Sequence, residues 1–238
     1  MVPRVEGARY RSFLRFLYEG VEGVVLLVLI VVSWPISRRW LANWGSTSSE
    51  QSAEWPGDRF VTGPEVINTR AVSVGASPVT VWPWIAQFGL GKAGFYSYEL
   101  LERVVGIPVR NIESVLPQFQ QLEVGEEILL HPNAPGIPVA EVQPGRFVCF
   151  GVSPELEDRF ERLEPNRTWS MYLTPGGEGS TRLVLRSCIE PLREATLVRR
   201  LGRSIEEAID FLMEQRMLRS VRRLSESGVG GGSPTVAS

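Results

Sequence analysis

The sequence predicts an α+β fold in which a curved antiparallel sheet wraps around one long C-terminal helix, preceded by an N-terminal transmembrane helix. Three observations lead to this prediction: an aliphatic run near the N-terminus, five or six short extended segments separated by turn residues, and a final amphipathic helix. Successive strands at hairpin spacing form antiparallel sheets. A strongly twisted sheet closed by one helix leaves space between the two.

Composition sets the first limits on function. The chain has 238 residues, 43% hydrophobic and 22% charged, which suits one domain with appendages. Its formal net charge of −2 gives no basic excess for nucleic acid. Cys149 and Cys188 lie in apolar runs and are expected to be buried thiols, while His131 is the single histidine. This side-chain set argues against a zinc site, and we expect no metal or cofactor.

The aliphatic run is expected to be a single-pass membrane anchor. No charged residue occurs from Gly23 to Ser37, and Trp34 and Trp40 lie at the end of this run, as in interfacial belts. The sequence Ser33-Trp34-Pro35 is a poor cleavage site for a signal peptide, and a core helix would show a polar stripe. Arginines favour a cytoplasmic N-terminus and, slightly, an extracytoplasmic main domain, with Arg4, Arg9, Arg11 and Arg15 before the run against Arg38 and Arg39 after it.

The remaining chain divides by composition and periodicity. Residues 1–40 are expected to form a cytoplasmic stub and the anchor, 41–65 a tether leading into the domain, 66–226 the main domain, and 227–238 a disordered tail. Strands are predicted at Thr69–Val74, Glu127–Leu130, Val139–Val142, Arg146–Phe150, Thr168–Leu173 and Arg182–Ile189. Short helices are predicted at Val79–Phe88, capped by Ser77, and at Ser97–Val105.

The last predicted helix, Ser204–Ser225, has Ser204 and Glu207 in a capping-box pattern and one apolar stripe facing the sheet. Met213 and Met217 in that stripe suit an adaptable lining, because the thioether chain is flexible and polarisable. The sequence leaves two interpretations. The stripe either roofs a ligand cavity or fills a solid core.

Several motifs resemble those of the SRPBCC superfamily of START-like, polyketide-cyclase-like and birch-pollen-allergen-like proteins, and more narrowly a membrane-tethered bacterial subgroup. They run in matching order over about residues 43 to 224: Trp44-Gly45, Pro56-Gly57-Asp58, Val81-Trp82-Pro83-Trp84, Gly94-Phe95-Tyr96-Ser97-Tyr98, Thr168-Trp169-Ser170 and Thr181-Arg182-Leu183. The resemblance implies a helix-grip fold and binding of lipids, sterols, polyketides or other apolar molecules. It implies no particular reaction, because function belongs to sites and not to folds.

Candidate ligand-binding residues follow from these motifs and from residue chemistry. Aromatic rings, an amide and two methionines suit an apolar pocket with a few polar groups, and Glu102 and Arg186 are the first ionisable residues to test. Arg186 lies on a strand face that is either exposed or paired with carboxylates, or else anchors a ligand carboxylate or phosphate. The full set is Trp82, Trp84, Gln87, Phe95, Tyr96, Tyr98, Glu102, Trp169, Arg186, Met213 and Met217.

The sequence therefore favours a membrane-anchored binding or carrier domain for a hydrophobic, lipid-like or polyketide-like molecule held between sheet and helix. The alternative is a cyclase or dehydratase acting on an apolar substrate, with Tyr96, Tyr98 or Glu102 handling protons. A third candidate is an interaction domain with a filled core. Serines lack a local base or a nucleophile-elbow motif, so catalysis is the less favoured class and no catalytic residue is assigned. Expected partners are a hydrophobic molecule or lipid and the membrane, without nucleic acid.

Overall fold

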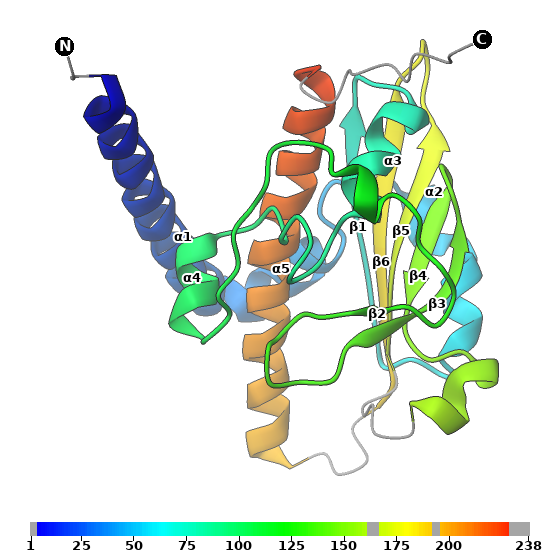
Figure 1. Cartoon of the computed structure of the whole chain (residues 1–238). Coiled ribbons are helices and arrows are strands. Elements are labelled where there is room, and N and C mark those ends of the chain that lie inside the picture. Colours follow the sequence, from blue (N-terminus) through cyan, green and yellow to red (C-terminus); the bar gives the residue numbers. More distant parts are fainter. Residues whose placement is uncertain (1–3, 161–166, 192–195, 229–238) are drawn as a thin grey trace, which may run out of the picture.

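The computed structural model describes residues 4–160, 167–191 and 196–228, whose arrangement Figure 1 shows. Six antiparallel strands form one sheet in the order β1-β6-β5-β4-β3-β2, and a long final helix, α5, lies along one face of it. This confirms the predicted α+β helix-grip architecture. Most of the tail predicted at 227–238 lies outside the described residues.

Each predicted strand is present, with small changes at its ends. The first and last strands lie side by side, because Val74 pairs with Thr181 and Val66 with Ile189. That pairing brings the two ends of the domain together. The bounds are β1 Val66–Val74, β2 Glu127–Ile128, β3 Ile137–Gln143, β4 Phe147–Phe150, β5 Arg167–Pro175 and β6 Thr181–Ile189.

The helices are α1 Arg4–Ala42, α2 Ser48–Ser52, α3 Pro78–Ala86, α4 Glu99–Val104 and α5 Leu197–Glu226, with short 3-10 turns η1 Pro56–Phe60, η2 Pro117–Phe119 and η3 Pro154–Arg159. Ser77 is the N-cap residue of α3, as predicted, although its hydroxyl bonds the Thr80 hydroxyl and not a backbone N–H. The capping box predicted at Ser204 is wrong. Ser204 lies inside α5, because the helix begins earlier, where the Thr196 hydroxyl accepts from the Arg199 N–H.

The two faces of the sheet are covered by different parts of the chain. On β6, Leu183 and Leu185 point inward to a core completed by α3 and the C-terminal half of α5. Val184 and Arg186 point to the opposite, outer face, as strand alternation requires. Figure 1 shows α2 on this outer side and α5 on the inner side.

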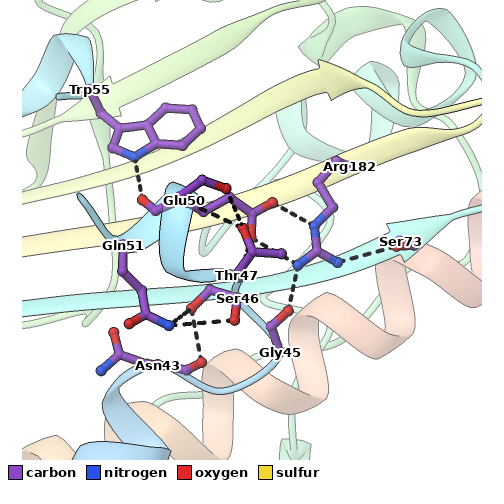
Figure 2. Close-up of polar contacts among 10 residues, drawn as sticks. Asn43, Gly45, Ser46, Thr47, Glu50, Gln51, Trp55, Ser73 and Arg182 are labelled. Atoms are coloured by element: carbon purple, nitrogen blue, oxygen red, sulfur yellow. Dashed lines mark hydrogen bonds and ion pairs between the residues drawn. The ribbon is translucent and has the colours of Figure 1, made fainter. Parts of the chain in front are cut away.

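The outer face is covered by residues 43–60, which we call the outer clamp. Figure 2 shows Arg182 donating to both carboxylate oxygens of Glu50, at 2.6 and 2.9 Å, and to the Gly45 carbonyl. Farther along, the Trp55 ring lies 4.5 Å from the Tyr172 ring, between centroids. The segment expected to be a tether is therefore fixed to the sheet by ion pairs and ring contacts.

Helix α1 is apolar enough to cross a membrane over Phe16–Trp34, where the mean hydropathy is 2.1 and 17% of the residues are buried. Core helices and signal sequences can satisfy the same criterion of length and composition. One side of α1 packs on α4 and α5, where Ile30 and Leu41 join a buried cluster with Phe211 and Leu212. Figure 1 shows α1 leaving this cluster toward its N-terminus alongside α4.

Candidate functional site

A hollow of about 270 Å³ lies beside α5, between that helix, α1 and the segment that leads into and follows α4. We call it the α1–α5 pocket. It lies on the side of α5 that faces α1, whereas the sequence predicted a cavity between α5 and the sheet. Its walls mix rings, arginines and carboxylates: Phe16, Glu19, Gly20, Tyr96, Ser97, Tyr98, Glu99, Leu100, Asn111, Glu113, Arg216, Ser220, Arg223 and Leu224.

Tyr96 lines this pocket in an unusual backbone conformation. Its φ is +55°, a left-handed value that residues other than glycine rarely adopt. The Asn111 carboxamide oxygen holds the turn by accepting from the backbone N–H groups of Phe95 and Tyr96, at 3.0 and 2.7 Å. The Tyr96 ring is thereby directed into the core, where its hydroxyl accepts from Gln87 Nε2 at 2.8 Å. Burial raises the pKa of this phenol far above its ordinary value.

Gln87, predicted to contact a ligand, is fully buried and hydrogen-bonded within the protein. Its amide nitrogen also donates to the Ser114 carbonyl at 3.0 Å, and its oxygen accepts from the Leu116 N–H at 2.8 Å. A buried amide with all these partners costs little to bury. Gln87 thus fixes Tyr96 and the loop after α4 in place.

Tyr98 and Arg216 meet at the pocket wall. The Arg216 guanidinium carbon lies 5.2 Å from the centre of the Tyr98 ring, and Arg216 also pairs with Glu19 of α1 at 2.7 Å. Burial is the main cause that raises the pKa of the Tyr98 hydroxyl, and Glu22 adds to it. A cation over a ring and beside a carboxylate joins α1, α4 and α5 at one point.

Glu102 lies behind this wall in the first turns of α4. The carboxylate is buried and accepts a short hydrogen bond from the Ser97 hydroxyl, while Oε2 has no hydrogen-bond partner within the described ranges. Burial raises the pKa of Glu102 to about 7, against the lowering effect of Ser97. Ser97 lines the pocket, so Glu102 reaches it through that hydroxyl.

The remaining aromatic candidates pack into the core beneath the C-terminal half of α5. Trp82, Trp84, Phe95 and Met217 belong to one continuous buried cluster. Phe88 lies between Phe95 and Trp169, with centroid distances of 5.2 and 5.0 Å. These side chains pack on one another between sheet and helix, and their predicted ligand contacts stay a prediction.

Trp169 instead leads to a polar cluster that sequence reasoning missed. Its indole N–H donates to Glu214 Oε1 at 2.9 Å, and Glu214 Oε2 pairs closely with Arg70, whose side chain is 1% exposed. One turn earlier on α5, Asp210 faces the same cluster. Burial, then the charge of Glu214, raises the pKa of Asp210 to about 7, although Arg167 and Arg70 oppose the shift.

A signal for this cluster existed in the sequence. Asp210 and Glu214 are four residues apart and therefore share one face of α5. The partner of this face, Arg70, lies far away in the sequence, on β1, and no local pattern connects it to α5. Met213 lies partly buried against α1, in the cluster around Phe211.

Arg186 is not brought to the other candidates. It lies on the outer face of the sheet, where it donates to both oxygens of Asp58 at 3.0 and 2.9 Å and to the Thr69 hydroxyl at 2.8 Å. The expected pairing with carboxylates is therefore the alternative that the structure adopts, and the Pro56-Gly57-Asp58 motif supplies the carboxylate. Across the described ranges, no three histidine, cysteine, aspartate or glutamate side chains are grouped to hold a metal ion.

No family model and no curated protein matches the chain. Solved structures with similar folds include the Zhui aromatase/cyclase from Streptomyces sp. R1128, with 13% identity over 71% of this chain and 98% of that protein, at a TM-score of 0.38. A Polyketide_cyc-like protein from Corynebacterium glutamicum shows 13% identity, 71% and 96% coverage, and a TM-score of 0.35. A protein from Mesorhizobium loti shows 13% identity, 66% and 96% coverage, and a TM-score of 0.35. At these scores, the fold assignment rests on strand order and on α5.

Proposed function

We propose that the protein is a membrane-anchored binding or carrier protein for a hydrophobic small molecule that bears a polar end. The observation that carries this proposal is the α1–α5 pocket, because one of its walls is the helix that is apolar enough to enter a membrane. A volume of about 270 Å³ is near the lower end for small-molecule sites, roughly 300–1,000 Å³. It suits one end of an amphiphile better than a whole lipid.

The charges at the pocket wall suit a carboxylate or phosphate on that end. Arg223 pairs with Glu113 at 2.5 Å, and both side chains are about half-exposed. Exposed ion pairs contribute only about 0–1 kcal/mol, so a ligand anion can replace Glu113 at small cost. Arginine presents a planar fork of donors that matches such anions.

The proposal also accounts for the apolar surroundings. A polar end held between Arg216 and Arg223 leaves the hydrocarbon part to follow α1, whose exposed residues between Val21 and Val32 are aliphatic. The membrane attachment then keeps the pocket beside its source of ligand. The sequence resemblance to a membrane-tethered SRPBCC subgroup supports this role of the anchor.

Native mass spectrometry of the full-length protein, released from mild detergent after incubation with a bacterial lipid extract, tests the proposal. We expect bound mass on the wild type and its loss in Ser220→Trp, because the indole fills the pocket wall. Glu206→Trp is the matched control, since Glu206 is exposed on the same helix. A wild type that carries no lipid from any extract, or equal bound mass on both variants, contradicts the proposal.

One observation favours the cyclase or dehydratase alternative. Glu102 has a pKa near 7, the range in which a carboxyl group can both donate and accept a proton, and Ser97 connects it to the pocket. Synthetic poly-β-keto thioesters, followed by mass spectrometry, test this role. The catalytic role is established if the wild type and the exposed control Glu123→Gln convert the thioesters and Glu102→Gln does not. No conversion by the wild type eliminates the role.

A further inference from the structure

Helix α1 has two apolar faces with different surroundings. Its inner face packs on α4 and α5 through Gly20, Gly23, Ile30 and Leu41, which are all buried. At Gly20 an added Cβ would lie 3.1 Å from Leu100 Cβ, so the helices approach closely there. Its outer face is an aliphatic stripe along the helix, formed by Leu17, Val21, Val24, Val28, Val32 and Ile36, which are 40–93% exposed.

Polar contacts fix the inner face at both ends of the apolar stretch of α1. Near its start, Glu19 pairs with Arg216 at 2.7 Å, and just after its end Arg38 pairs with Glu207 at 3.4 Å. Beyond this, the Leu41 carbonyl accepts from Arg70 Nε at 3.0 Å. Backbone bonding continues immediately after the helix, where the Ala71 N–H donates to the Trp44 carbonyl at 3.1 Å.

The docked helix cannot also cross a bilayer. A spanning segment needs hydrocarbon around it over about 30 Å, whereas docked α1 has the charged helix α5 along one side. Glu207 and Arg216 of α5 contact α1 at Arg38 and Glu19, so crossing would bring these charged side chains and the helix between them against the bilayer. Only the outer stripe is available to lipid in this arrangement.

We infer that docked α1 lies in the plane of a membrane surface. The stripe from Leu17 to Ile36 then lies in the boundary between headgroups and acyl chains, and α4 and α5 lie on the aqueous side of α1. The partner is a lipid bilayer, because the stripe is aliphatic, long and unbroken by charge, and Trp40 at its end is 62% exposed. This inference rests on the membrane attachment in the proposed function, and it specifies its geometry.

The geometry has a consequence for ligand access. Phe16, Glu19 and Gly20 of α1 line the α1–α5 pocket, so an in-plane helix places that pocket at the membrane surface. An amphiphile then has only about the width of α1 to travel from the bilayer to the pocket. A spanning α1 would have to separate from α5 and would take this wall of the pocket with it.

A reversible covalent lock between α1 and α4 tests the inference. The double variant Gly20→Cys/Leu100→Cys places two Cβ atoms near the 3.5–4.5 Å that a disulfide needs, and the native cysteines are buried on the sheet. Full-length protein is diluted from detergent into vesicles of phosphatidylcholine and phosphatidylglycerol, and binding is measured by flotation with the disulfide formed or reduced. We expect equal binding in both states.

Each other outcome has one meaning. Binding only after reduction overturns the in-plane geometry but leaves membrane attachment intact, because α1 must then leave the domain. Binding in neither state removes the membrane attachment in the proposed function as well. In the oxidised protein, Val28→Glu should weaken vesicle binding at least about tenfold, and Val124→Glu, equally exposed elsewhere, should not. Equal binding by these two variants overturns the role of the stripe.

Discussion

Removing the charge of Glu214 tests whether the polar cluster under α5 holds the helix to the sheet. Arg70 is 1% exposed and pairs with Glu214, whose other oxygen accepts from the Trp169 indole. The change Glu214→Gln keeps shape and an acceptor for Trp169 but leaves the arginine without its anionic partner. Breaking a buried ion pair by removing one partner costs about 3–5 kcal/mol.

Two contacts of Arg70 survive the change and place the expected loss near the lower end of that range. Its Nε still donates to the Leu41 carbonyl at 3.0 Å, and its guanidinium still lies 5.3 Å from the centre of the Phe211 ring. We therefore expect the free energy of unfolding to fall by about 3 kcal/mol in Glu214→Gln. Urea unfolding of the full-length protein in mild non-ionic detergent, followed by tryptophan fluorescence, measures it.

A matched exposed pair supplies the control. Glu141 pairs with Arg59 at 2.8 Å, but Arg59 is 62% exposed, so Glu141→Gln should cost under about 1 kcal/mol. The double change Arg70→Met/Glu214→Met should cost less than the sum of the two single changes, because no charge is left buried alone. If Glu214→Gln costs no more than Glu141→Gln, the cluster does not hold α5 and this reasoning is refuted.

Two further changes probe the same interfaces. Because the pKa of Asp210 is raised to about 7 from an ordinary 3.8, its protonated form stabilises the fold, and this contribution is lost as pH rises from about 4 through 7. Asp210→Asn should therefore stabilise the protein more at about pH 8 than at about pH 5 in urea unfolding, with Asp158→Asn at an exposed site as the control. An effect of Asp210→Asn that is the same at both pH values would refute the shift. Gly45 has a φ of +72°, and an added Cβ would lie 2.2 Å from the Ala71 carbonyl oxygen, so Gly45→Ala should cost several kcal/mol by strain and collision. Gly63→Ala, at φ +60° with nothing within 4 Å of the added Cβ, should cost only about 1 kcal/mol. Equal decreases in Tm for the two variants would show that the outer clamp can move to accommodate a side chain at Gly45.

The candidate site was predictable only in part. The Gly-Phe-Tyr-Ser-Tyr motif brought Tyr96 and Tyr98 to a pocket wall, because glycine-rich turns aim the residues that follow them. The partners that complete the wall, Glu19 and Arg216, lie far apart in sequence and at no spacing that a local pattern reveals. Likewise, Arg186 seemed equally suited to water, carboxylate or ligand until Asp58 was found opposite it.

The sequence by itself determined the elements of this protein. Alternation and helical periodicity are local consequences of backbone geometry, and so the strands, α5 and the apolar stretch of α1 could be placed from residue order alone. Only the tertiary structure decided where α1 lies, which face of the sheet the outer clamp covers, and that the hollow adjoins α1. Those outcomes depend on contacts between distant residues such as Arg70, Glu214 and Leu41, whose energies arise only when the chain brings them together.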